Sequence, residues 1–476
     1  MLNYTDPVYE IVEKTSGIRR VEVDVTYCKS ETNEEERIKI LDKEAKENSL
    51  FSMAFVQKLA NDGDKHAKEI QAIYHGYKQY MENGDFTALK NICNRILKSK
   101  NPYTFPKDAA RYLLALMAKQ PVDPQLKKAK NLLNKLIPGL EKTLSKAPWQ
   151  KIDKEQKITI PKRKGCKHNA FPDLIKFGNA YYAAYREAKS HVGYGDLGAV
   201  RILKGYYEPK AKIWKWNSMQ LLKDAAYDLR DPRFFVDHEN ALRILCGGSL
   251  IDENDETISM APHVAALKNK RWHMEKAIVD PSANGTNGQW IWRVTWNSFD
   301  NCGYAFSYSE KAFSLVRTLD GRTFEKVTEI TFDNVTEASE ATIRFKADGT
   351  AVALIRARRN GVIGISNPAH DYRIWKFHVI PFRIGGPNFV FSHDEKSMWA
   401  ATRHFFLHPD NDIEEATILA SMDQKELIPS LKLRSSYDSS YPGLVLEEDG
   451  SLTVLYYSST VKGASSLYIT RVLPKV

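Results

Sequence analysis

From residue 168 to the C-terminus, short alternating or apolar runs are separated by turn signals, and this pattern constrains the fold more than any other feature. The runs are five to eight residues long and include YYAAYRE, AVRILKG, WIWRVTW, TAVALIRA and LTVLYYSS. Asp-Gly pairs, which favour tight turns, stand at 320–321, 348–349 and 449–450. Many short strands with such turns predict an all-β sandwich or propeller. About 300 residues, at roughly 45 to 50 per four-stranded blade, suit about six blades.

Residues 34–146 follow the helical period instead. Within 65–81, apolar side chains recur at steps of three and four, as in an amphipathic helix: Ala67, Ile70, Ile73, Tyr74, Tyr77 and Tyr80. Further helical stretches are expected at 34–60, 107–119 and 124–145, the last interrupted at 138–139 by Pro-Gly. This part of the chain therefore predicts a small helical bundle. The alternating VEVDVTY near the N-terminus predicts one added strand, and a helical insertion is expected at 261–278.

These two patterns divide the chain into a mostly helical accessory domain (1–150), a basic linker (151–167) and a β domain (168–476). The net charge of +10 is local, because residues 101–167 hold 16 basic and 5 acidic side chains whereas residues 168–476 hold 37 of each. A solvated lysine face followed by a basic linker is the favoured interpretation. Without interleaved aromatics or a nucleic-acid motif, nucleic acid is not an expected partner. Contact with an anionic surface stays open, through Lys127, Lys128, Lys130 and Lys135.

The chain also lacks several common signals. No run approaches the roughly 18 to 20 apolar residues of a transmembrane segment. The N-terminus has no basic stretch followed by an apolar core, so we expect a cytoplasmic protein, or one exported without a cleaved signal peptide. The five cysteines are widely spaced, and no Cys/His pair sets up a zinc site. We therefore expect a reduced compartment and neither metal nor cofactor.

Several motifs in the β region carry a resemblance to a known family. They are HNAFPDLIKFGNAYYAAYRE followed by GDLGAVRI, SEATIRFKADGTAVALIRAR, KSMWAATRHFF, YDSSYPGLVLEEDGSLTVLYYSS, and the shortened Asp-box TLDGRTF. Together they resemble the sialidase superfamily of six-bladed propellers, especially a sialidase-like subgroup whose substrates are poorly defined. The resemblance covers residues 168–476. It implies an all-β, six-bladed sialidase-like propeller over these residues. With the helical bundle that the periodicity predicts, we expect a multi-domain protein in which an all-α bundle precedes the propeller.

The resemblance also implies a catalytic set. Tyr441 would be the nucleophile and Glu340 its base, while Arg356 and Arg403 would bind a carboxylate. Tyrosine has an ordinary pKa near 10, so its hydroxyl needs a neighbouring carboxylate to accept the proton during attack. A tyrosine nucleophile also avoids placing a carboxylate nucleophile against a negatively charged sugar. The planar fork of arginine suits a bidentate contact to a carboxylate.

The sequence departs from the family pattern at two places. Ala170 stands where the first arginine of the carboxylate-binding triad is expected, and the aspartate that serves as general acid has no counterpart in SHVGYGD. Asp173 or Asp231 could supply the acid instead. Further anion contacts are expected from other polar side chains near strand starts and ends: Arg186, Arg230, Arg293 and His191.

These observations favour a retaining glycoside hydrolase of the sialidase-like type, an exo-glycosidase acting on a glycoside with an anionic group. The alternative is a propeller without catalytic activity that binds carbohydrate or a protein, with the helical domain contacting the protein partner. The absent arginine and acid favour the alternative. Whether the protein is an enzyme stays open at this point.

Overall fold

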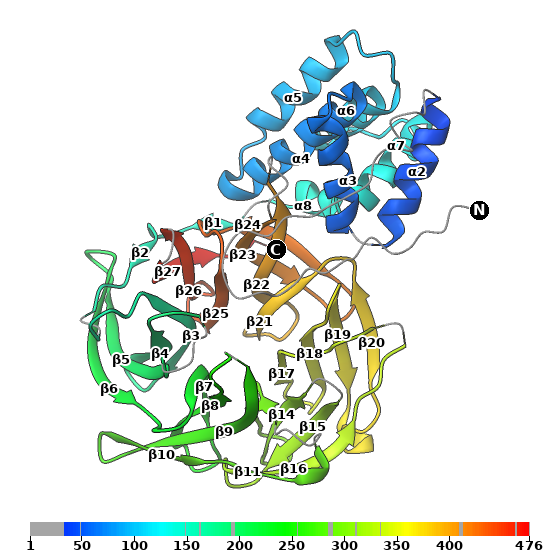
Figure 1. Ribbon diagram of the computed structural model, residues 1–476. Coiled ribbons are helices and arrows are strands. Elements are labelled where there is room, and N and C mark those ends of the chain that lie inside the picture. The colour runs from blue at the N-terminus through cyan, green and yellow to red at the C-terminus, as the bar shows by residue number, and fades with distance from the viewer. Residues whose placement is uncertain are drawn as a thin grey trace.

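A computed structural model describes residues 33–475, except 48, 148, 161–162, 192–195, 255, 284–288, 310–311, 334, 409–412 and 462–463. A helical bundle packs on the edge of a ring of six antiparallel sheets (Figure 1). The predicted fold class, a helical bundle followed by a six-bladed β-propeller, is therefore confirmed. The strand expected in VEVDVTY lies outside the described residues.

The helices follow the predicted amphipathic pattern. Their bounds are α2 (Glu34–Glu47), α3 (Ser49–Asn61), α4 (Lys65–Asn83), α5 (Thr87–Lys98), α6 (Phe105–Met117), α7 (Lys127–Leu136) and α8 (Leu140–Ser145). Helix α4 begins where the Asp64 carboxylate accepts from the Ala67 N–H at 2.8 Å, and ends at Gly84, which has φ +71°. Gly139, with φ +83°, separates α7 from α8 at the predicted break.

Each blade is built from strands that follow one another in the chain. Blade one comprises β3 (His168–Phe177), β4 (Ala180–Ala188), β5 (Ala199–Glu208) and β6 (Ile213–Leu222). Blade two comprises β7 (Asp228–Val236), β8 (Leu242–Ile251), β9 (Thr257–Lys268) and β10 (Arg271–Lys276). Blade three comprises β12 (Trp290–Ile291), β13 (Thr295–Asn297), β14 (Cys302–Tyr308), β15 (Phe313–Thr318) and β16 (Thr323–Glu329), with β11 (Ile278–Val279) beside β16.

The remaining blades follow the same order. Blade four comprises β17 (Ala341–Phe345), β18 (Ala351–Arg356), β19 (Gly361–Ser366) and β20 (Lys376–Ile380). Blade five comprises β21 (Ile384–Phe391), β22 (Met398–Leu407), β23 (Ile413–Met422) and β24 (Leu427–Lys432). Blade six comprises β25 (Ser439–Leu446), β26 (Leu452–Val461) and β27 (Ala464–Leu473). In the five blades other than blade three, the first strand, β3, β7, β17, β21 or β25, lies toward the centre of the ring (Figure 1).

The ring is closed by strands from both ends of the propeller sequence. Short strands β1 (Gln150–Lys151) and β2 (Gln156–Lys157) pair antiparallel with β27, the last strand of the chain. These residues precede the predicted start of the β domain at 168, and most of them fall in the expected linker. The segment therefore joins the helical bundle to the propeller and also completes blade six.

The helix expected at 261–278 is wrong, because this segment forms the outer hairpin of blade two. Strands β9 and β10 pair across a two-residue turn at Asn269 and Lys270, whose φ angles are +50° and +65°. Two consecutive left-handed residues form the turn type that matches the twist of a hairpin. Pairing of β9 with β8 on its other edge decides the structure, and this long-range contact outweighs the local helical spacing.

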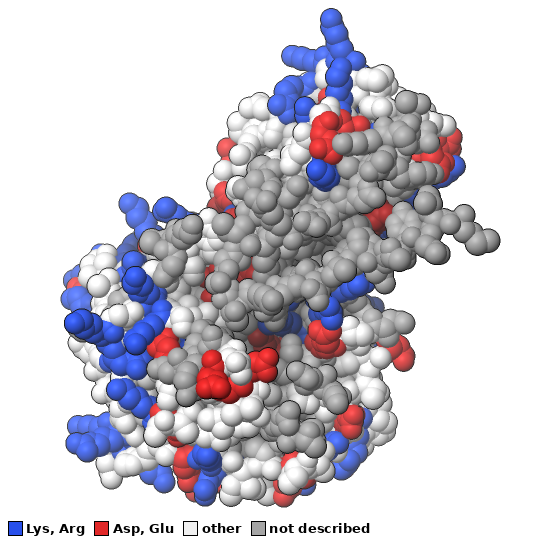
Figure 2. Space-filling model, viewed as in Figure 1, with Lys and Arg blue, Asp and Glu red and all other residues white. Residues whose placement is uncertain are grey.

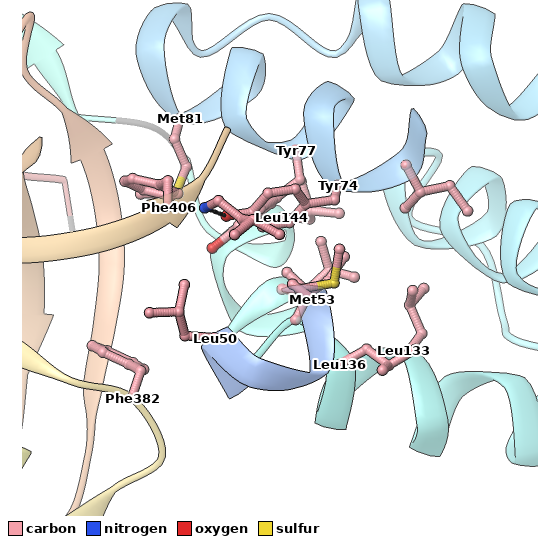
Figure 3. Packing of buried hydrophobic residues seen from close by; sticks show 14 of the residues in the cluster. Leu50, Met53, Tyr74, Tyr77, Met81, Leu133, Leu136, Leu144, Phe382 and Phe406 are labelled. Carbon is pink, nitrogen blue, oxygen red and sulfur yellow. Dashed lines mark hydrogen bonds between the residues drawn. The ribbon is translucent and has the colours of Figure 1, made fainter. Parts of the chain in front are cut away.

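The helical bundle and blade five share one hydrophobic core. Helix residues Leu50, Tyr74 and Met81 lie against Phe382 and Phe406 of the propeller (Figure 3). The Tyr74 hydroxyl accepts from the Leu407 N–H at 3.0 Å, and the Thr143 hydroxyl donates to the Pro429 carbonyl at 2.8 Å. This face of the bundle is therefore covered by the protein's own propeller.

Lysines of helix α7 form ion pairs with acidic side chains of the helical bundle. Lys130 pairs with Glu141 at 2.6 Å, and Lys135 pairs with Asp42. Figure 2 shows Lys and Arg side chains gathered over β2, β5 and β6, where Lys157, Lys204 and Lys215 are exposed. Among the described residues, no helix is both long and apolar enough to cross a membrane.

Candidate active site

Four inner strands carry the same irregularity, a bulge in which a left-handed residue stands directly before proline. The pairs are Phe171-Pro172 in β3, Asp231-Pro232 in β7, Gly386-Pro387 in β21 and Tyr441-Pro442 in β25. The φ angles of the first residues are +56°, +49°, +55° and +49°. A left-handed conformation costs a non-glycine residue about 1–2 kcal/mol. Such strain and such bulges concentrate at functional sites, where they re-aim a side chain.

The bulge in β25 aims Tyr441 at Glu340, which immediately precedes β17. The Tyr441 hydroxyl donates to Glu340 Oε1 at 2.5 Å. Arg356 Nη1 lies 2.7 Å from the same oxygen and 3.3 Å from the tyrosine hydroxyl. The backbone N–H of Gly386 donates to Glu340 Oε2 at 2.6 Å. Both carboxylate oxygens are therefore held by donors, with Oε1 directed at the phenol.

Gly386 makes room for this pair. A Cβ added at residue 386 would lie 2.6 Å from Cγ of Tyr441, closer than any two such atoms can approach. Glycine also accepts the left-handed φ of +55° without a steric cost. The glycine thus serves two purposes, because its backbone orients Glu340 and its missing side chain admits the tyrosine ring.

Burial governs the ionisation of Tyr441. Its side chain is 7% exposed, and burial together with the Glu340 carboxylate raises its pKa well above 10. Arg356 and Arg403 offset only part of this effect. The phenol is therefore protonated in the resting protein. A reaction at its oxygen requires transfer of the proton to Glu340, which is already its hydrogen-bond acceptor.

Asp231 is a second carboxyl group near this pair. It is 8% exposed, and its Oδ1 has no hydrogen-bond partner among the described residues. Burial raises the pKa of Asp231 to about 6; Arg233 and Arg230 lower it and Glu340 raises it further. The pKa of Tyr308, at the end of β14, is raised by burial and by the charges of Glu340, Asp231 and Tyr441, so these three groups lie close to this residue. A carboxyl group with a raised pKa can hold a proton near neutral pH and donate it.

Asp173 and Arg293, two predicted site residues, are engaged with each other. Asp173 is fully buried, and Arg293 Nη1 and Nη2 bind its two oxygens at 3.0 Å each. Asp173 Oδ2 also accepts from the Phe234 N–H at 2.8 Å. The pair ties blade one to blades two and three. Because the polar atoms of Asp173 and Arg293 serve this connection, the predicted acid role of Asp173 and the predicted anion contact of Arg293 have no support in the structure.

Arg186 is likewise committed to the scaffold. It is fully buried and binds Asp228 of blade two through Nε at 2.9 Å and Nη2 at 2.8 Å. Its Nη1 donates to the Ser190 carbonyl at 2.7 Å. The structure therefore uses Arg186 to connect blades one and two, and leaves its predicted anion contact without support.

Arg403 contacts Tyr441 but is surrounded by protein groups. Its guanidinium lies 5.0 Å from the Tyr441 ring centroid, within cation–π distance. Nη1 is 2.9 Å from Glu415 Oε2, and Nη2 is 2.9 Å from Asp438 Oδ1. The side chain is 6–7% exposed. Arg403 therefore packs over the tyrosine ring, and the carboxylates of Glu415 and Asp438 balance its charge.

His191 belongs to a cluster whose geometry could suggest a metal ion. Ligand atoms of His168, His191 and Asp438 lie within 4.8 Å of one another, and each histidine has a ring nitrogen 3.0 Å from Asp438 Oδ2. The other ring nitrogens face arginine donors at 3.2 Å, Arg186 for His168 and Arg230 for His191. Arginine only donates, so these nitrogens accept and both ring protons point at Asp438. A metal ion would displace those protons toward the arginines, so the residues fit a hydrogen-bonded cluster instead.

The structure adds residues that sequence reasoning missed. Arg233 is 1% exposed, donates to the carbonyls of Phe171, Pro172 and Pro232 at 2.8–3.2 Å, and lies 4.3 Å from the Trp292 ring centroid. Asp438, Glu415 and Gly386 were also missed. The sequence does contain one signal for the bulges, namely the recurring X-Pro pairs at 171–172, 231–232, 386–387 and 441–442.

Comparisons with known proteins bear on the fold. No family model and no curated protein matches the chain. A protein of unknown function from Dyadobacter fermentans DSM 18053 is similar, with a TM-score of 0.54 at 13% identity, covering 71% of this chain and all of that one. A Trypanosoma rangeli sialidase mutant displaying trans-sialidase activity has a TM-score of 0.46 at 12% identity, covering 68% of this chain and 59% of that one. The NanB sialidase from Streptococcus pneumoniae also has 0.46 at 12% identity, covering 74% and 72%. The likeness to the Dyadobacter fermentans protein shows a shared fold.

Proposed function

We propose that the propeller is a retaining glycoside hydrolase in which Tyr441 is the nucleophile. The observation that carries this proposal is the 2.5 Å hydrogen bond from the buried Tyr441 hydroxyl to Glu340, held by Arg356 and the Gly386 N–H. A buried tyrosine with its proton on a fixed carboxylate is the arrangement that an activated phenol nucleophile needs.

The reaction would run in two balanced steps. In the first step, the Tyr441 oxygen bonds to the anomeric carbon while its proton passes to Glu340. Asp231, which holds its proton below about pH 6 because burial raises its pKa to about 6, gives that proton to the departing glycosidic oxygen. In the second step, the Asp231 carboxylate takes a proton from water, the water oxygen bonds to the anomeric carbon as the bond from that carbon to the Tyr441 oxygen breaks, and Glu340 returns the proton to Tyr441. Retention follows from the two displacements.

An anionic glycoside is the substrate class that best accounts for a tyrosine in this role. A carboxylate nucleophile would repel a negatively charged sugar, whereas a neutral phenol does not. Arginine side chains also surround the site, with Arg356 at the tyrosine hydroxyl and Arg403 at its ring. Their presence makes the surroundings of the tyrosine rich in positive charge, which supports an anionic substrate class.

Initial rates on a panel of aryl glycosides, neutral and anionic, test the proposal. Tyr441→Phe should lower kcat by about 10²-fold or more on the glycoside that the wild type cleaves best. Tyr456→Phe, which changes a buried tyrosine of the same blade whose hydroxyl donates to the Arg434 carbonyl at 3.4 Å, is the matched control and should leave kcat within about twofold. Equal turnover in wild type and Tyr441→Phe, or no turnover in either, would remove the catalytic claim.

A propeller without catalytic activity is the second candidate. The observation that favours it is the absence of an arginine at Ala170, combined with the enclosure of Arg403 by Glu415 and Asp438. Glycan binding that survives Tyr441→Phe, with no hydrolysis by the wild type, would support this alternative.

A further inference from the structure

The arginines of the site differ in how their charge is matched. Five of the arginines that surround the bulged inner strands have a carboxylate oxygen within 4 Å. The pairs are Arg186 with Asp228 at 2.8 Å, Arg233 with Asp231 at 3.6 Å, Arg293 with Asp173 at 3.0 Å, Arg356 with Glu340 at 2.7 Å and Arg403 with Glu415 at 2.9 Å. Arg230, on the first strand of blade two, has no such partner among the described residues.

Arg230 also has unused hydrogen-bonding capacity. Its Nη2 donates to His191 Nε2 at 3.2 Å, and its guanidinium lies 5.2 Å from the Phe171 ring centroid. The guanidinium has five N–H donors, and the described residues accept from one of them. Arg344 on β17 also lacks a carboxylate, but its three nitrogens bind Phe389, Thr295 and Asn388. Arg230 is therefore the arginine of this region that has no carboxylate oxygen within 4 Å and most of its donors unused among the described residues, although its charge does act on the neighbouring Asp231.

The position of Arg230 relative to Tyr441 restricts where a bound charge can lie. Arg356 is the arginine at the tyrosine hydroxyl, 3.3 Å away, and Ala170 supplies no second cation beside it. Arg230 is one side chain further out, because it contacts Phe171, whose ring centroid lies 5.0 Å from that of Tyr441. A sugar whose carboxylate is attached to the anomeric carbon would place its charge at Tyr441 instead.

We propose that Arg230, supported by His191, binds the carboxylate of a uronic acid, a sugar whose charge lies across the ring from the anomeric carbon. The planar fork of Arg230 suits a bidentate contact with that carboxylate. The inference rests on the proposed function, because that function places the anomeric carbon at Tyr441. Arg403 then acts as a positioning residue for the tyrosine ring.

Binding in an inactive background separates this inference from the proposed function. The full chain carrying Tyr441→Phe is titrated by calorimetry with methyl glucuronide and methyl galacturonide, both anomers, and with the matching neutral glycosides. At least one uronide should bind about tenfold or more tightly than its neutral counterpart. Adding Arg230→Gln should bring that ratio to within about twofold of one, whereas Arg230→Lys should retain part of it. Lys204→Gln, which removes an exposed charge on β5, should leave the ratio unchanged.

Three results would overturn the inference: equal or no binding of uronides and neutral glycosides, a preference that persists in Arg230→Gln, or tighter binding of a methyl sialoside than of either uronide. None of these readouts depends on turnover. If the wild type hydrolyses no glycoside of the panel while the uronide preference in binding is intact, that result would contradict the proposed function alone.

Discussion

The bulge of blade five yields a prediction whose size follows from the structure. Gly386→Ala introduces a Cβ at a residue with φ +55°, where it would lie 2.6 Å from Tyr441 Cγ. The left-handed conformation costs alanine about 1–2 kcal/mol. Displacing a packed ring costs about 1–3 kcal/mol more. We therefore expect the free energy of unfolding to fall by about 2–5 kcal/mol.

A matched glycine isolates the contact with the ring. Gly450, in the Asp-Gly turn of blade six, has φ +78°, and a Cβ there meets no atom within 4 Å. Gly450→Ala should therefore show only the conformational cost of about 1–2 kcal/mol. Urea unfolding, analysed at constant slope, measures both variants. The loss of stability in Gly386→Ala beyond that in Gly450→Ala should disappear when Gly386→Ala is made in the Tyr441→Ala background, because the ring that the new Cβ would meet is gone.

Two results would refute this reasoning. The first is a loss of stability in Gly386→Ala within about 0.5 kcal/mol of that in Gly450→Ala. The second is an excess that persists in the Tyr441→Ala background. Either would mean that the tyrosine ring does not lie against residue 386.

Further predictions concern one titrating group and one ion-pair cluster. Asp231 must be protonated to act as an acid, so activity should fall as pH rises above about 6, and Asp231→Asn should flatten this limb of the pH–rate profile while lowering kcat by about 10²–10⁴-fold. The pKa of Asp231 is about 6 in the folded protein against an ordinary 3.8, so ionisation of Asp231 destabilises the fold as pH rises through that range. The free energy of unfolding of Asp231→Asn, measured with urea, should therefore rise relative to wild type by up to about 3 kcal/mol between pH 4 and pH 8. Lys432 is 6% exposed and binds Glu82 at 2.6 Å and Glu414 at 2.7 Å at the junction with the helices. Lys432→Ala should therefore lower the free energy of unfolding by about 3–5 kcal/mol, and a loss below about 1 kcal/mol would contradict this expectation. Lys142→Ala, which removes the exposed partner of Glu426, should change it by about 1 kcal/mol or less.

Local signals made much of the fold predictable. Each predicted Asp-Gly turn has its glycine in the left-handed region, as at Gly321, Gly349 and Gly450. The apolar stripe of 65–81 became the buried face of α4, including Ile70, Ile73 and Tyr77. The helix expected at 261–278 failed because its spacing fits either structure, and the edge of β8 decided between them.

The family resemblance supplied the central residues of the candidate site, and polar side chains near strand starts and ends added Asp231, Arg230 and His191. That resemblance predicted Tyr441, Glu340, Arg356 and Arg403, and the structure brings Glu340, Arg356 and Arg403 each into contact with Tyr441. Which carboxylate matches which arginine was not predictable, because partners such as Asp173 and Arg293 are 120 residues apart. Packing between blades likewise pairs Asp173 with Arg293 and leaves Asp231 Oδ1 without a hydrogen-bond partner among the described residues.

Covalent trapping tests the role of Tyr441 most directly. Wild-type protein is incubated with a panel of 2-deoxy-2-fluoro glycosyl fluorides, neutral and uronic, and examined by intact-mass and peptide mass spectrometry. The account predicts one glycosyl adduct per chain, located on Tyr441, and no adduct in Tyr441→Phe. An adduct on any other residue, or none with any member of the panel, would contradict it.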